Sequence, residues 1–83
     1  MVSPVKLAVV NIDPQSPEHP YKQVAAQLKK QIERGDVTAQ LPSITVLTAQ
    51  TGLAVGTVRR AIDILVKEGF VQTVPGRGTF VQR

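Results

Sequence analysis

Two short segments contain the side chains best suited to bind a polyanion. The first holds Arg59 and Arg60, preceded by Thr57, and the second is the Gly-Arg-Gly segment at 76–78. A guanidinium group donates strong, charge-assisted hydrogen bonds to phosphate oxygens, and a glycine lets main-chain N–H groups approach the same partner closely. These residue types favour contact with the backbone of a nucleic acid.

The two arginines belong to an amphipathic helix that the sequence predicts over residues 54–68. Arg60 falls opposite its apolar face, while Val55 and Arg59, one turn apart, line a flank near the start of the helix. The apolar residues follow the i, i+3, i+4, i+7 spacing that gathers side chains on one face: Val58, Ala61, Ile62 and Leu65. A helix with this face and a basic, small-residue N-terminal half suits the DNA major groove, so we predict a recognition helix.

The Gly-Arg-Gly segment is the tip of a predicted β-hairpin. Gly69 stands where a left-handed residue ends a helix, and β-prone runs at 70–74 and 79–83 flank a turn at 75–78. A hairpin with a basic tip, placed directly after a recognition helix, is typical of a wing. We expect the wing tip, residues 75–79, to enter the minor groove.

The composition indicates one small domain with a polyanionic partner. The 83 residues are 42% hydrophobic, and ten Lys and Arg against six Asp and Glu give a formal net charge of +4. Such a charge attracts nucleic acid through counterion release and steering. Only 4% of the residues are aromatic, which argues against a stacking platform for single strands.

Several other classes of protein are not favoured. The sequence has no cysteine, no catalytic pair of carboxylates, no nucleophile-and-base spacing and no Walker-type phosphate loop, so we expect neither an enzyme nor a cofactor. The single histidine, His19, has no second candidate ligand nearby, so we expect no metal site. The apolar run at 7–10 is too short to cross a membrane, and we expect a cytoplasmic protein associated with the nucleoid.

The N-terminal part of the chain differs in character from the rest. Residues 5–12 are β-branched and apolar, and a strand formed there would need the wing sheet or another subunit as its partner. A connector with three prolines follows. We therefore expect residues 1–19 to precede a domain formed by residues 20–83.

Two further helices complete the predicted domain. The first extends from Pro20 to Arg34, and the second from its N-cap Ser43 to about Thr51, where Gly52 turns the chain toward the recognition helix. This order predicts an α+β fold, a winged helix-turn-helix, with a three-helix core, a C-terminal β-hairpin wing and an N-terminal strand.

The same residues resemble a known family. The chain is similar over residues 20–82 to the GntR family of bacterial transcription regulators, in these motifs: Tyr21 with Gln23, Ile32 with Gly35, Leu41-Pro42-Ser43, Thr57-Val58-Arg59 with Ala61, Leu65 with Glu68-Gly69, and Gly76-Arg77-Gly78-Thr79-Phe80-Val81. The resemblance implies binding to operator DNA, usually as a homodimer on an inverted repeat. Members generally continue into an effector-binding or oligomerisation domain, and we find no small-molecule effector site in this chain.

Four positions depart from the family pattern. Thr45 and Val55 stand where members usually have arginine, Val46 replaces the acidic residue of a capping box, and Ala54 replaces the usual hydroxyl cap of the recognition helix. Losing a base-contacting arginine removes ~1 to 3 kcal/mol of discrimination. Either Val55 and Thr45 contact thymine methyl groups instead, or this surface binds a protein.

Two functional hypotheses follow from these observations. The first is a sequence-specific regulator that binds duplex DNA through these residues: Ser43, Thr45, Val55, Gly56, Thr57, Arg59, Arg60, Gly76, Arg77, Gly78 and Thr79. The second is a winged-helix interaction module that uses Ile44, Val46 and Val55 as an apolar contact patch for a partner protein.

Overall fold

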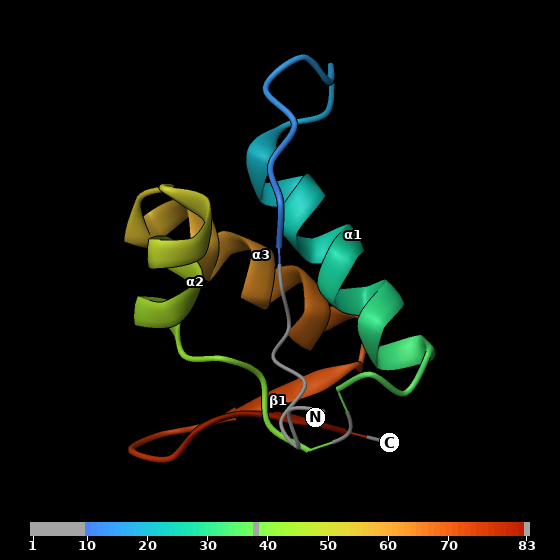
Figure 1. Ribbon diagram of the computed structural model, residues 1–83. Helices are drawn as coiled ribbons and strands as arrows, with labels where there is room; N and C mark the ends of the chain where they lie inside the picture. Colours follow the sequence, from blue (N-terminus) through green and yellow to red (C-terminus); the bar gives the residue numbers. More distant parts are fainter. Residues whose placement is uncertain (1–9, 38, 83) are drawn as a thin grey trace, which may run out of the picture.

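Helix α3 (Val55–Lys67) lies at the centre of the fold, and both other helices pack against it (Figure 1). The computed structural model describes residues 10–37 and 39–82. The other elements are α1 (Pro20–Glu33), α2 (Ile44–Thr51), β1 (Val71–Val74) and β2 (Gly78–Val81). Three helices are thus followed by a two-stranded antiparallel hairpin, in the predicted order.

The core forms where the apolar faces of the helices meet. Helix α3 buries all four residues of its predicted stripe, α2 adds Leu47, and α1 adds four residues that recur at helical spacing: Val24, Ala25, Leu28 and Ile32. Burying a leucine-sized side chain stabilises a fold by about 1.5 to 3 kcal/mol. The core therefore fixes the orientation of α3 and, with it, the side chains on its opposite face.

The turn between α2 and α3 depends on a glycine. Gly52 ends α2 with φ of 74°, and its N–H donates to the carbonyl oxygen of Thr48 at 2.8 Å. This left-handed conformation is costly for residues with a Cβ. Gly69 likewise has a positive φ, of 82°, just after α3, as the sequence predicts.

A third segment extends the wing sheet. Strands β1 and β2 pair in the register Val71↔Val81 to Val74↔Gly78. On the other edge of β2, Gln40 forms a bridge with Phe80, and the N–H of Leu41 donates to the Thr79 carbonyl at 2.9 Å. Because residues 39–41 lead directly into α2, this pairing ties the wing to the start of α2.

The strand expected over residues 5–12 is absent from residues 10–12, the part of this range that the structure describes. Residues 5–9 lie outside the described residues, and residues 10–12 belong to no strand. Val10 is buried, and the backbone N–H and C=O of Asn11 both bond to the side-chain amide of Gln27 on α1. The backbone at Asn11 is thus satisfied by a helix side chain.

Candidate nucleic-acid interface

The start of α2 presents one set of predicted contact residues. The Ser43 hydroxyl accepts a hydrogen bond from the backbone N–H of Val46 at 3.2 Å, which confirms Ser43 as the N-cap. Thr45 is exposed in the first turn, and its carbonyl oxygen accepts from the Thr48 hydroxyl at 2.8 Å. The Thr45 side chain is therefore available at the surface on a helix end that is held in place.

The start of α3 presents a second set. Ala54 occupies the N-cap position and makes no side-chain cap, as expected from its methyl side chain. Val55 and Gly56 are exposed, and Thr57 is half-buried. A Cβ built on Gly56 would meet nothing within 4 Å, so the protein itself does not require glycine there.

The two arginines of α3 have different surroundings. The Arg60 guanidinium lies over the Tyr21 ring of α1, 4.3 Å from its centroid, in a cation–π contact. Arg59 is exposed, and within residues 10–37 and 39–82 it has no ion-pair or aromatic partner. Arg60 is thus oriented by α1, whereas no described side chain holds the Arg59 guanidinium. The sequence alone did not indicate Tyr21 as the platform for Arg60.

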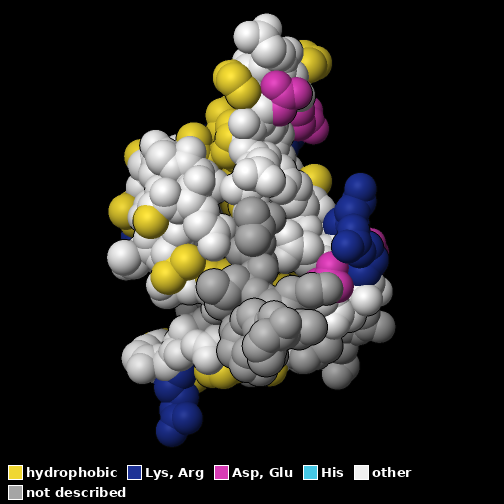
Figure 2. Space-filling model, viewed as in Figure 1, with side chains coloured by type: hydrophobic (Ala, Val, Ile, Leu, Met, Phe, Trp, Pro, Cys, Tyr) yellow, Lys and Arg dark blue, Asp and Glu magenta, His cyan; other side chains and the backbone are white. Residues whose placement is uncertain are grey.

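The wing tip is a tight turn with an exposed cation. Gly76 has φ of 76° after Pro75, and the N–H of Arg77 donates to the Val74 carbonyl at 3.0 Å. Proline second and a left-handed glycine third are typical of a type II turn. Arg77 is exposed at the tip, where the space-filling view shows a basic side chain projecting from the hairpin (Figure 2).

A side chain that sequence reasoning missed connects the wing tip to the body of the domain. The amide nitrogen of Gln40 donates to the Arg77 carbonyl at 3.0 Å. A Cβ built on Gly78 would lie 2.6 Å from the same nitrogen, so Gly78 leaves room for this bond. The position of Gln40 in the sequence, just before Leu41-Pro42-Ser43, does not predict this hydrogen bond. It follows only from the pairing of Gln40 with the edge of β2.

A groove of about 320 Å³ separates the start of α2 from the wing. It brings together six of the predicted contact residues: Ser43, Thr45, Gly76, Arg77, Gly78 and Thr79. The other five, on α3, do not line it: Val55, Gly56, Thr57, Arg59 and Arg60. The predicted site therefore consists of a groove beside α2 and a separate surface at the start of α3.

The alternative contact patch is wrong for one of its three residues. Ile44 is half-buried and packs against the core, whereas Val46 and Val55 are exposed by 40% and 49%. Residues two apart in a helix point about 200° apart, so Ile44 and Val46 cannot share one face of α2. The exposed apolar residues that remain of this patch are Val46 on α2 and Val55 on α3, and hydrophobic side chains are visible over α2 in Figure 2.

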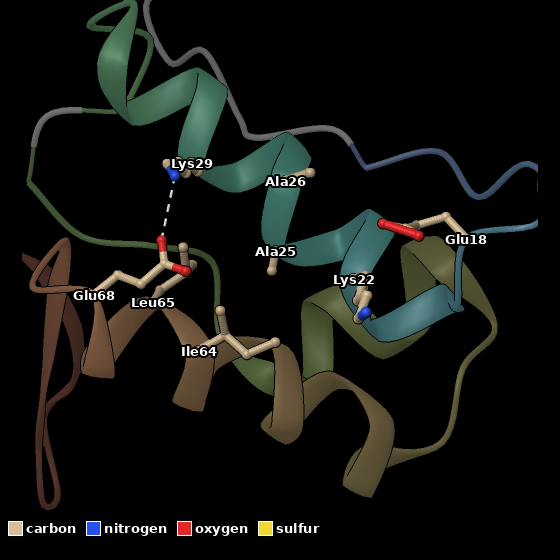
Figure 3. A pocket seen from close by; sticks show the side chains of 8 residues that line it. All are labelled: Glu18, Lys22, Ala25, Ala26, Lys29, Ile64, Leu65 and Glu68. Carbon is tan, nitrogen blue, oxygen red and sulfur yellow. Dashed lines mark hydrogen bonds and ion pairs between the residues drawn. The ribbon is translucent and has the colours of Figure 1, made fainter.

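A second hollow, of about 380 Å³, lies between α1 and α3 (Figure 3). Its floor is formed by small and apolar side chains of both helices, and its rim holds Lys22 and Lys29 with Glu18 and Glu68. The Lys29 ammonium group lies 3.3 Å from a Glu68 carboxylate oxygen and 5.1 Å from the centre of the Phe70 ring. We call this hollow the α1–α3 groove.

The described residues offer neither a metal-binding cluster nor a membrane-spanning helix. No group of three or more His, Cys, Asp and Glu side chains is placed to hold a metal ion in that part of the chain. No helix among the same residues is long and apolar enough to span a membrane.

Comparison with known proteins places these features in a family. Residues 20–81 match the profile of "Bacterial regulatory proteins, gntR family". The chain is 42% identical over 76 residues to the HTH-type transcriptional repressor NagR of Bacillus subtilis, an alignment that covers 89% of this chain and 31% of NagR. The chain thus spans less than a third of the length of that relative.

Solved structures agree with the sequence match. YtrA from Sulfolobus acidocaldarius, a GntR-family transcription factor, has a TM-score of 0.82 and 35% identity, covering 90% of this chain and 81% of that one. AraR(DBD) in complex with operator ORX1 has a TM-score of 0.76 and 34% identity, covering 90% and 95% of the two chains. The chain therefore belongs to the gntR family of bacterial regulatory proteins and has a winged helix-turn-helix fold.

Proposed function

We propose that this chain binds an operator in duplex DNA, with the start of α3 in the major groove and the wing tip, residues 75–79, in the minor groove. The observation that supports this most directly is the state of two arginines. Arg59 on α3 and Arg77 on the wing are both exposed, and neither guanidinium has an acidic partner in the described part of the chain. Unpaired cations on neighbouring elements suit the phosphates on either side of a groove.

The contact residues then divide by chemistry. Arg59, Arg60, Thr57 and the Ser43 end of α2 hold phosphates, since their donors are exposed or half-buried. A guanidinium stacked on a ring keeps its edge donors available, so Arg60 remains in this set. Val55, Gly56 and Thr45 lie against base edges, and Gly76, Arg77, Gly78 and Thr79 form the minor-groove contact.

We further propose that the protein acts as a homodimer on an inverted repeat. A two-fold symmetric dimer places its two recognition helices in successive major grooves, about 10 base pairs apart or a multiple of this. Residues 20–83 form the DNA-binding domain and residues 1–19 its N-terminal extension. Binding to chromosomal DNA would locate the protein in the cytoplasm, at the nucleoid. The operator complexes formed by AraR(DBD), at 34% identity, support the DNA-binding part of this proposal.

The test is selection of bound sequences from a random duplex pool by the purified chain, with elution at two salt concentrations. We expect an enriched inverted repeat that persists at the higher salt. Retention that is independent of sequence and disappears at the higher salt would contradict the proposal, because a +4 chain attracts any polyanion weakly.

A further inference from the structure

The most exposed large apolar side chain among the described residues is at the start of α3. Val55, its first helical residue, is 49% exposed, more than Val46 or Val66. Val55 lies three residues before Val58 and seven before Ile62, at the edge of the buried stripe, but it belongs neither to the core cluster nor to the partly buried residues packed against it. The structure thus leaves Val55 open to contact with an external partner.

The surroundings of Val55 are those of a DNA-facing surface. Residues four apart in a helix lie on the same side, so Val55 is next to Arg59, whose charge has no partner among the residues described. The neighbouring Gly56 has no side chain, which leaves the surface beside Val55 low and open. Val55 and Arg59 together can therefore contact a partner that carries an apolar group next to an anionic group.

Duplex DNA offers both groups in its major groove. The phosphates are anionic, and the 5-methyl group of thymine is the apolar feature that base edges present there. Valine is also stiff in a helix, because its branched Cβ strongly prefers one rotamer. Its methyl groups are held in one position and can distinguish a thymine from a cytosine.

We propose that Val55 is a specificity-determining residue that selects a thymine in each operator half-site through contact with its 5-methyl group. This inference rests on the proposed function. Arg59 lies about 6 Å further along the helix, at about 1.5 Å per residue, so the selected thymine lies within about two base pairs of the Arg59 contact.

The test uses the operator duplex obtained by selection. Each thymine of a half-site is replaced in turn by deoxyuridine, which keeps the base pair and removes only the methyl group, and affinity is measured by fluorescence anisotropy. We expect one replacement to weaken binding of the wild-type chain about four-fold per half-site, the amount that burial of one methyl group contributes. In Val55→Ala, the same replacement should change affinity less than about two-fold.

Three controls make the result specific. Val66→Ala removes another exposed valine of α3, 39% exposed and near the other end of the helix, and should keep the wild-type sensitivity to deoxyuridine. Exchange of the selected thymine for cytosine should weaken wild-type binding, and 5-methylcytosine at that position should recover part of the loss. Thermal melting should show that Val55→Ala is as stable as wild type, because the side chain is exposed.

The outcomes separate the two proposals. Equal deoxyuridine sensitivity of wild type and Val55→Ala at every position would overturn the thymine contact while leaving operator binding intact. So would a uniform loss of affinity in Val55→Ala, or a loss of self-association with no change in DNA binding. If the wild-type chain does not distinguish the selected duplex from random DNA, operator binding itself fails, and the thymine contact fails with it.

Discussion

The α1–α3 groove and the surface formed by α2, the start of α3 and the wing differ in how some of their cations are partnered. In the α1–α3 groove, the ammonium group of Lys29 is paired with Glu68 and lies over Phe70. On the other surface, Arg59 and Arg77 have no acidic partner within the described residues. Lys22, on the rim of the α1–α3 groove, likewise has no acidic partner within those residues, so the two regions differ at Lys29 and at the two arginines. The availability of a cation therefore has to be decided residue by residue, and not from the number of positive charges in a region.

The largest expected effect is a loss of operator affinity when Arg59 and Arg77 are replaced, compared with replacing two lysines of the α1–α3 groove. The double variant Arg59→Ala/Arg77→Ala should weaken operator binding more than about ten-fold, and flatten the dependence of log K on log salt by about 1.8 per protomer, or about 0.9 for each charge removed from the DNA contact. The matched variant Lys22→Ala/Lys29→Ala, which removes two charges from the rim of the α1–α3 groove, should change both quantities far less. Anisotropy titrations at several salt concentrations measure this. Equal losses in the two variants would mean that only net charge matters.

A smaller expected effect concerns Gly56, where one substitution should change the stability of the fold and the affinity for DNA in opposite directions. Gly56→Ala should raise the free energy of unfolding by about 0.5 to 1 kcal/mol, because glycine is a poor helix former and the added Cβ meets nothing within 4 Å. The same methyl group should weaken DNA binding, since it projects from the proposed major-groove surface. Urea unfolding and anisotropy measure the two quantities.

Gly52→Ala is the matched control for this change. Gly52 has φ of 74°, so the same addition should instead destabilise the fold by about 1 to 2 kcal/mol. If Gly56→Ala binds DNA as wild type does, the backbone of α3 does not approach the bases at that residue.

The smallest expected effect is in the α1–α3 groove. Lys29 and Glu68 side chains are 42% and 45% exposed, and exposed ion pairs contribute about 0.2 to 1 kcal/mol. A double-mutant cycle with Lys29→Ala and Glu68→Ala should give a coupling in this range that falls with added salt, and DNA affinity should stay unchanged. A strong effect of Glu68→Ala on operator binding would show that the two regions are not independent.

Much of the fold could be predicted because it depends on local patterns. The i, i+3, i+4, i+7 spacing of α3 specified which residues enter the core, and all four are buried. Ser43 was identified as a cap from its hydroxyl group, and Gly52 as a turn from its lack of a Cβ. These features depend on residues within about one helical turn of each other, so the sequence contains the information directly.

The errors concern contacts between distant segments. Residues 10–12 have the composition of a strand, yet the backbone of Asn11 bonds to Gln27 on α1. Ile44 was expected to be exposed with Val46, but packing of α2 on the core partly buries it. A propensity describes one residue and its neighbours, and tertiary packing overrides it.

The sequence by itself determined the order of the elements, the buried stripe of α3, the basic wing tip and the family resemblance. Only the tertiary structure decided which charges are available. Arg59 and Arg60 are adjacent in the chain, yet only Arg60 meets the Tyr21 ring of α1. Among the described residues, Arg59 has no ion-pair or aromatic partner. Only the structure connected Gln40 with the Arg77 carbonyl, 37 residues away. The physical reason is that the partner of a charge or a hydrogen-bond donor is set by which segments fold together.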